Sequence, residues 1–136
     1  MRSPDDASRQ RQILRELVAD YGRQLRQILQ VRHLLKGSVY QLRTRCGHPS
    51  CHCARDRDRR HSATVLSWSE AGRTRIRSIP VPERARVRRW AAQYRRLRQA
   101  RVAVSRLHQQ ILRAIDRLEQ ALRLPPPAPA RRKPRR

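Results

Sequence analysis

The sequence contains no phenylalanine, and aromatic residues make up only 4% of its 136 residues. Acidic residues are also scarce, with 10 Asp and Glu against 34 Lys and Arg. No apolar run approaches the ~18 residues that a membrane-spanning helix needs, and the polar, acidic N-terminus is unlike a signal peptide. This composition excludes a large globular core. We expect one domain at most, stabilised by helix contacts, a metal or a partner.

The formal charge is +24, and self-repulsion on this scale opposes compaction unless a polyanion neutralises it. Only Lys36 and Lys133 are lysine. A GC-rich genome would explain why arginine replaces lysine, but it would not explain the shortage of acids. Nucleic acid is therefore the expected partner. Nothing in the composition indicates a membrane or a small-molecule substrate.

The N-terminal segment has the pattern of an amphipathic helix. Ser3 can cap the helix, and Pro4 suits its first position. Apolar residues then follow in alternating steps of four and three, at Leu14, Val18, Tyr21, Leu25 and Ile28. Because Gly37 provides a C-terminal stop, we predict one helix over about residues 4–36, within an N-terminal segment that spans 1–36.

A second, longer helix is predicted over residues 82–124. Nine of eleven positions in its heptad pattern are apolar, the eleven being Val87, Trp90, Tyr94, Leu97, Arg101, Val104, His108, Ile111, Ile115, Leu118 and Leu122. Polar residues such as Arg101 and His108 usually set register or partner number at such positions. We expect the two helices to pair antiparallel, and residues 82–122 to form a homodimer or bind a partner helix.

The chain on either side of residue 125 differs in composition. Proline dominates 125–129 and arginine dominates the last six residues. Proline-rich segments are extended, and a cluster of like charges does not fold by itself. Residues 125–136 are therefore predicted to be a disordered basic tail.

Residues 37–81 change to the period of β-structure. Residues 39–45 alternate loosely, and 64–69 and 73–79 form a clearer pair around a short turn at 70–72. We expect a hairpin in which one face carries apolar side chains and the other carries arginines. The apolar face would hold Leu66, Trp68 and Ile76, and the opposite face would hold Arg73, Arg75 and Arg77. These arginines are either a ladder for phosphates or an ordinary solvated face.

All three cysteines lie within eight positions, at Cys46, Cys51 and Cys53, and His61 follows them. Four thiolate and imidazole ligands in a closed tetrahedron are typical of structural zinc. Metal binding would supply the folding free energy that a small hairpin lacks. We therefore predict a structural zinc site. A redox-active thiol group, an iron–sulfur cluster and coincidence are the alternatives.

The fourth ligand is less obvious than the three thiols. His52 would point away when Cys51 and Cys53 face inward, and His48 lies close to Cys46. His61 returns at the start of the next strand and can close the site across a loop, so we predict His61.

The order of these residues resembles a family of small bacterial proteins. The resemblance rests on Leu35-Lys36-Gly37-Ser38-Val39, Arg45-Cys46-Gly47-His48-Pro49-Ser50-Cys51-His52-Cys53, Arg60-His61, Leu66-Ser67-Trp68 and Gly72-Arg73-Thr74. The family carries a Cys-Gly-Lys-Pro-x-Cys-x-Cys signature, a His-Gly-Pro-Tyr segment and a Ser-Trp strand. His48 replaces the usual Lys, and Ser62-Ala63 replaces Gly-Pro. The resemblance covers roughly residues 34–100. It implies a zinc-motif architecture, and it implies no activity because the family is a domain of unknown function.

The sequence does not predict an enzyme. The acidic residues are scattered, and Asp56 and Asp58 lie between arginines that we expect them to pair with. A nuclease or transposase would need several acids to hold metal ions. A catalytic zinc keeps one open position, so a hydrolytic zinc held by the three cysteines is an alternative only if His61 is not a ligand.

Together these patterns predict an α+β protein, with two long helices flanking a small zinc-stapled β-hairpin over 37–81. We expect a cytoplasmic, nucleoid-associated accessory protein that binds DNA rather than RNA, because few aromatics are available to stack on bases. The alternative is a protein-interaction adaptor in which the coiled coil recruits a partner. The predicted nucleic-acid contacts are Arg43, Arg45, Arg55, Arg57, Arg59, Arg60, Arg73, Arg75, Arg77, Arg84, Arg88 and Arg89.

Overall fold

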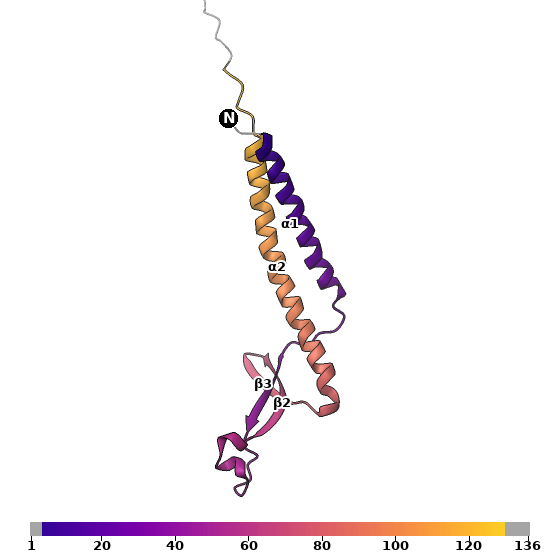
Figure 1. Cartoon of the computed structure of the whole chain (residues 1–136), viewed down its shortest axis with the longest axis vertical. Helices are drawn as coiled ribbons and strands as arrows, with labels where there is room; N and C mark the ends of the chain where they lie inside the picture. The colour runs from indigo at the N-terminus through magenta and orange to yellow at the C-terminus, as the bar shows by residue number, and fades with distance from the viewer. Residues whose placement is uncertain (1–3, 130–136) are drawn as a thin grey trace, which may run out of the picture. The chain divides into compact units, whose positions relative to one another are not determined.

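The computed structural model describes residues 4–129, and it confirms the α+β class (Figure 1). Residues 130–136 of the predicted tail lie outside the described residues. The described elements are α1 (Pro4–Gln30), β1 (Ser38–Thr44), η1 (His52–Ala54), η2 (Arg57–Arg59), β2 (His61–Glu70), β3 (Arg73–Ser78), η3 (Val81–Glu83) and α2 (Arg84–Leu122). Neither described helix is both long enough and apolar enough to cross a bilayer.

The chain divides into two compact units, and both helices contribute to each. The helical unit, in its described part, is residues 4–23 with 103–129. The sheet unit is residues 24–102, which include all three strands and the cysteines.

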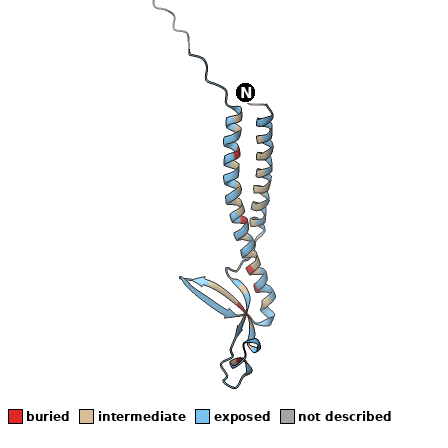
Figure 2. Cartoon of the chain, turned by 60° about the vertical axis from the view of Figure 1, so that its left-hand side comes forward, coloured by how far each residue is buried: buried red, intermediate tan, exposed pale blue. Residues whose placement is uncertain are grey.

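In the helical unit, the α1 and α2 segments run side by side in opposite directions (Figures 1 and 2). Ala7 of α1 and Ala114 of α2 are buried. Ile13 and Leu17 line a shallow hollow together with Gln110 of α2. Both buried residues are small, and few large side chains are buried in the described part of this unit.

Most positions predicted from apolar periodicity are covered, among them Tyr21 of α1 and Ile111 and Leu118 of α2, but some are not. Half-buried or buried positions in α2 include Leu107, Ala114 and Ala121, whereas the predicted His108, Ile115 and Leu122 are exposed. In α1, likewise, Leu17 and Gln24 are half-buried while Val18 and Leu25 are exposed, and Arg101 of α2 is exposed too. The covered face therefore combines predicted apolar positions with neighbouring residues such as Ala114, and the larger side chain of Ile115 stays exposed.

The first helix ends at Gln30 rather than near Lys36. The Val31 N–H donates to the Ile28 carbonyl oxygen at 3.2 Å, which tightens the last turn. The Leu35 N–H then donates to the Trp90 carbonyl oxygen of α2 at 3.0 Å. The chain after Gln30 is therefore held by α2 and does not continue the helix.

Gly37 has a packing role instead of the predicted role as a helix stop. A Cβ atom at Gly37 would lie 2.7 Å from the Ser67 carbonyl oxygen and 2.9 Å from Leu66 Cδ1. Neither distance is tolerable for a real Cβ atom, and the oxygen belongs to the backbone of β2. Glycine therefore lets the chain enter β1 in close contact with β2.

The sheet has three antiparallel strands in the order β1-β2-β3, one more strand than the predicted hairpin. The strand β1 corresponds to the loosely alternating segment at 39–45 and pairs with β2 from Ser38↔Ser67 to Thr44↔His61. β2 is therefore the central strand. Its residues Thr64 and Val65 are almost fully buried, and the Gln41 side-chain amide donates to Thr64 Oγ1 at 2.9 Å.

The predicted division of the hairpin faces is wrong. Ala71 and Gly72 both have positive φ, at 48° and 74°, and Glu70 pairs with Arg73, so the turn has two residues. Trp68 then pairs with Arg75 and Leu66 with Arg77. Direct partners share a face, so the arginines of β3 lie on the side of Leu66 and Trp68, while Ile76 lies with Ser67 on the other side. The prediction placed three residues, 70–72, in the turn. A shift of one residue in strand pairing moves every side chain of a strand to the opposite face.

The core is small, and buried positions are few and scattered along the chain (Figure 2). In the sheet unit they are Cys53, Thr64, Val65, Ile79, Val87, Ala91 and Ala100. Most of these side chains are small. Apolar burial alone therefore provides limited stability to the sheet unit, which makes other sources of stability important.

Candidate metal centre

The pairing of β1 with β2 brings both ends of the cysteine segment together. Thr44 and His61 form the last pair of this ladder, so His61 begins β2 opposite the end of β1. Cys46 follows Thr44 by two residues. The chain leaves the sheet after Thr44 and returns to it at His61. The two ends of the loop therefore lie side by side.

The first half of this loop turns twice. Gly47 has a φ of 86°, a conformation that favours glycine. The Cys51 N–H donates to the His48 carbonyl oxygen at 3.1 Å, and the Ala54 N–H donates to the Cys51 carbonyl oxygen at 3.1 Å as η1 begins. These turns direct Cys51 and Cys53 back towards Cys46.

The second half of the loop is fastened to the sheet. The Asp58 N–H donates to Asp56 Oδ1 at 3.0 Å and starts η2. Arg43 of β1 donates from Nη2 to the Asp58 carbonyl oxygen at 2.9 Å. Asp56 also forms the predicted kind of ion pair, with Arg59 at 3.5 Å. Arg43 is therefore partly engaged in holding the loop.

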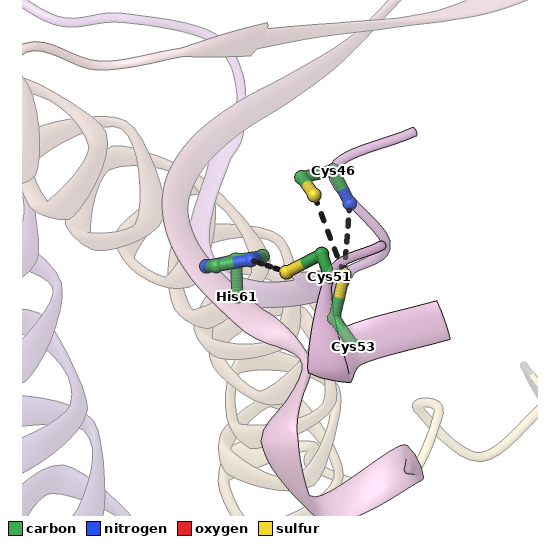
Figure 3. Close-up of side chains that lie close together, drawn as sticks. All are labelled: Cys46, Cys51, Cys53 and His61. Carbon is green, nitrogen blue, oxygen red and sulfur yellow. Dashed lines mark hydrogen bonds between the residues drawn. The ribbon is translucent and has the colours of Figure 1, made fainter. Parts of the chain in front are cut away.

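The four predicted ligands lie together and could hold a metal ion. The ligand atoms of Cys46, Cys51, Cys53 and His61 all lie within 4.8 Å of one another (Figure 3). Cys51 Sγ is 3.2 Å from His61 Nε2, and Cys53 Sγ is 3.5 Å from Cys46 Sγ. A tetrahedral zinc site with Zn–S near ~2.3 Å and Zn–N near ~2.05 Å has edges of about 3.5–3.8 Å. Among the described residues, neither His48 nor His52 joins this group.

The surroundings favour thiolate at one cysteine and thiol at another. The pKa of Cys51 is lowered to about 6, first by the backbone N–H of Cys53 and then by the His61 side chain. The backbone N–H of Cys46 lowers the pKa of Cys53, but burial and the neighbouring thiols outweigh it and raise that pKa overall. A cation at the centre would reverse the second effect, because it stabilises every thiolate around it.

All twelve predicted nucleic-acid contacts belong to the sheet unit. Most of them are exposed, including Arg45, Arg55, Arg57, Arg73 and Arg77. Four have partners within the fold, one of them being Arg43, which donates to the Asp58 carbonyl oxygen. Arg75 pairs with Glu70 at 3.4 Å, Arg59 pairs with Asp56, and the half-buried Arg84 donates to the Ile79 carbonyl oxygen at 3.2 Å.

Arg60 is the exception among these arginines. It is half-buried, and its Nε is buried with no hydrogen-bond partner. It directly precedes His61, one of the four clustered side chains that could hold a metal ion. We therefore assign Arg60 to the packing of the loop rather than to an exposed basic surface.

A basic hollow lies beside the start of β1, and only the fold reveals it. Gly37, Ser38 and Val39 form one wall, and Arg88, Arg89, Ala91, Ala92 and Arg95 of α2 form the other, around a volume of about 480 Å³. The three arginines are exposed. Arg88 and Arg95 lie seven residues apart, about two helical turns, which could be found in the sequence. The strand wall that makes the surface concave could not.

Charge is divided very unequally between the two units. The sheet unit contains 20 Lys or Arg and 4 Asp or Glu, a formal charge of +16. The described part of the helical unit contains 8 Arg and 6 Asp or Glu, a formal charge of +2. The unit that contains the cysteine cluster therefore carries +16 of the formal charge of +24.

Comparison with known proteins gives a family and no further relative. Residues 8–89 match the family described as a domain of unknown function, DUF6788. Because the match covers more than half of the chain, the protein belongs to this family. The matched residues include the cysteine cluster and the complete sheet, and they begin further towards the N-terminus than the predicted resemblance. No curated protein and no solved structure gave a significant match.

Proposed function

We propose that this member of the family is a non-enzymatic accessory protein that binds nucleic acid, DNA in preference to RNA, through its sheet unit. The observation that carries the proposal is the formal charge of +16 on 79 residues, against +2 on the described helical unit. A general bias towards arginine would affect both units. A surplus of basic over acidic residues concentrated in one folded unit is typical of a surface that neutralises phosphates.

We further propose that the metal is zinc and that its role is structural. Three thiolates and one imidazole complete a tetrahedron and leave no position for a substrate or a water. Cys46 and His61 come from the two strand ends, and Cys51 and Cys53 come from the loop between them. A zinc ion bound here would supply stability that the small core of the sheet unit lacks. These residues hold the loop that displays Arg55 and Arg57.

Duplex DNA is favoured because the sheet unit offers much charge and few platforms for stacking, Tyr40 being its one exposed aromatic residue. Trp68 and Trp90 are half-buried, and Arg86 lies over the Trp90 ring at 5.2 Å from its centroid. Single-stranded DNA and RNA are usually bound by exposed aromatic rings that stack on bases. Phosphate contacts to a duplex need only the exposed guanidinium groups. A cytoplasmic, nucleoid-associated location is part of this proposal.

The test is a salt titration of binding to a labelled DNA duplex, with single-stranded DNA and duplex RNA of the same length measured beside it. Binding is expected at low salt, and log affinity should fall linearly with log salt at a slope of roughly −0.9 for each neutralised phosphate. DNA should be bound more tightly than RNA. Failure to bind any of the three nucleic acids at low salt would overturn the proposal.

Zinc has a separate test. Protein purified under reducing conditions should contain one zinc ion per chain by elemental analysis, and Cys51→Ser should lose it. His52→Ser is the matched control, because His52 is not in the cluster and the variant should keep its zinc. Purified protein without zinc, or with a different metal, would contradict the assignment.

A protein-interaction adaptor is the second candidate, and a specific observation favours it. Several large apolar side chains of the helices are exposed, among them Val102, Leu112 and Ile115 of α2. We therefore keep the proposal that residues 82–122 contribute to a coiled-coil homodimer or bind a partner helix. An adaptor would show association through these helices and no binding to nucleic acid at any salt concentration.

A further inference from the structure

The helical unit has an apolar stripe that no described residue covers. The stripe consists of Val18 of α1 with Leu112, Ile115 and Leu122 of α2, whose exposed fractions are 54%, 49%, 45% and 48%. In α2 these residues follow one another at steps of three and seven, so they share a helix face. In a chain with so few large apolar residues, four of them at the surface of one unit need a physical reason.

The stripe residues of the two helices lie on the same side of the helix pair. Ile13, Gln110 and Arg117 line one side of the contact between α1 and α2. Each of them comes one position before a half-buried residue. Val18 and Ile115 each follow a covered residue by one position, Leu17 and Ala114. One residue advances an α-helix by ~100°, so they lie on the opposite side of the contact. Val18 and Ile115 therefore belong to one surface made by both helices.

Charge on this surface differs between the two helices. On α1, Arg11 and Arg15 line an open hollow with Leu14 and Val18, with a volume of about 460 Å³. On α2, Asp116 lies one turn after Leu112, and Glu119 lies one turn after Ile115. Glu119 also pairs with Arg123 along its own helix. The α1 side of the stripe is thus basic and the α2 side carries the acids.

We propose that this stripe is the surface through which two copies of the chain associate, with α1 of each copy against α2 of the other. A two-fold axis places the same patch on both copies, so Arg11 and Arg15 of one copy meet Asp116 and Glu119 of its partner. The low net charge of the described part of the helical unit permits this contact, whereas the sheet unit would repel its own copy. The inference specifies the homodimer within the proposed function, but it does not depend on DNA binding.

The test is the molar mass in solution of nuclease-treated protein, measured by sedimentation equilibrium over a range of concentrations in about 0.5 M salt, where the Debye length is only a few ångströms. Nuclease treatment removes nucleic acid that could join two copies. A mass of twice 16.1 kDa is expected. Because symmetry places each substitution in the interface twice, Ile115→Glu should raise the dissociation constant at least ~100-fold. A monomeric wild-type protein overturns the proposal.

Ile76→Glu is the matched control. Ile76 lies on β3, is 53% exposed and undergoes the same chemical change, yet it lies outside the stripe and should leave the dimer intact. Circular dichroism at 222 nm verifies that each variant keeps its helices, and Leu112→Lys serves as a second stripe variant if Ile115→Glu does not fold. The assignment of the interface to this stripe is overturned if the dimer survives both stripe variants, or if Ile76→Glu disrupts the dimer as strongly as they do.

Charge reversal tests which helices meet. Arg15→Glu and Glu119→Arg should each weaken association, and the double variant should restore it, because the reversed charges face each other across the axis. A double variant weaker than both single variants would contradict the pairing of α1 with α2 of the partner.

Discussion

The helical unit and the sheet unit differ in charge balance and in the residues that they bury, although both have few apolar residues. The helical unit balances 8 arginines with 6 acids in its described part and buries small residues such as Ala7 and Ala114 between two helices. The sheet unit carries 20 basic and 4 acidic residues around a core that includes a potential metal ligand, Cys53. The charge of the first unit is nearly balanced in its described part, whereas we expect the second to depend on a bound cation for its stability.

This difference means that the two units should respond to different perturbations. Removal of a cation or of arginines should affect the sheet unit, because its fold and proposed function depend on them. Association of two copies should depend on the helical unit and its apolar stripe. Four changes test whether the units can be separated in this way.

The largest effect is expected from loss of the metal site. Cys53→Ser removes the most buried ligand, and structural zinc contributes roughly 10 kcal/mol or more in small domains. We expect the sheet to unfold, with loss of the near-ultraviolet circular dichroism of Trp68 and loss of DNA binding. Most of the helical signal at 222 nm should remain. A sheet that keeps its tryptophan signal in the variant and after chelation would show that the metal does not stabilise it.

The next effect concerns the location of the phosphate contacts. Changing Arg73, Arg75 and Arg77 together to Gln should weaken duplex binding about tenfold or more and reduce the salt slope by up to ~2.7, at ~0.9 for each lost contact. The matched control changes three exposed arginines of the helical unit, Arg9, Arg106 and Arg117, to Gln. Both variants lose three charges. If the two triple variants weaken DNA binding equally, affinity depends on the total charge of the protein and not on which unit carries it.

Gly37→Ala should destabilise the sheet unit by about 1–3 kcal/mol, the range for overpacked sites. The new methyl group would meet the Ser67 carbonyl oxygen and Leu66, and the backbone oxygen cannot move without disturbing β2. Urea unfolding followed by tryptophan fluorescence measures the change. Ser38→Ala, at an exposed position of the same strand, should have little effect. The self-association of the protein should not change in either variant.

The smallest effect is a gain in stability. Ala71 has a φ of 48°, which a residue with a Cβ adopts at a cost, and asparagine tolerates this conformation better. Ala71→Asn should stabilise the hairpin by about 0.5–1 kcal/mol, because Asn-Gly is the favoured pair for such a turn. Ala71→Val should have the opposite sign in the same urea experiment. A loss of stability with Asn would contradict the two-residue turn.

The metal ligands and the fold class could be predicted from the sequence, because both depend on local order. The four ligands are close in the chain, and the return of His61 required only that the loop be followed by a strand. The amphipathic patterns gave both helices, although the end of α1 near Gln30 depends on a hydrogen bond to Trp90 that no local pattern reveals.

The features that could not be predicted depend on small differences in register. The face of the β3 arginines is decided by whether Glu70 pairs with Arg73 or belongs to the turn, and both choices suit the sequence. The stripe between the helices is decided by Ala114 rather than Ile115, against the preference for large apolar residues. The division of charge between the two units could not be predicted for a different reason. It depends on which distant segments of the chain fold together into one unit.

The closed ends of the cysteine loop have one more consequence. Cys46 and His61 lie at the two strand ends, so a metal bound between them would close the loop as a ring, with the Arg43–Asp58 hydrogen bond as a further link to the sheet. Lengthening a closed loop is inexpensive, about 0.6 kcal/mol for each doubling. The exposed stretch between Cys53 and Arg60 can therefore accept insertions and new side chains while the strands stay in register. It is the part of this molecule where binding preference could change during evolution without a change of fold.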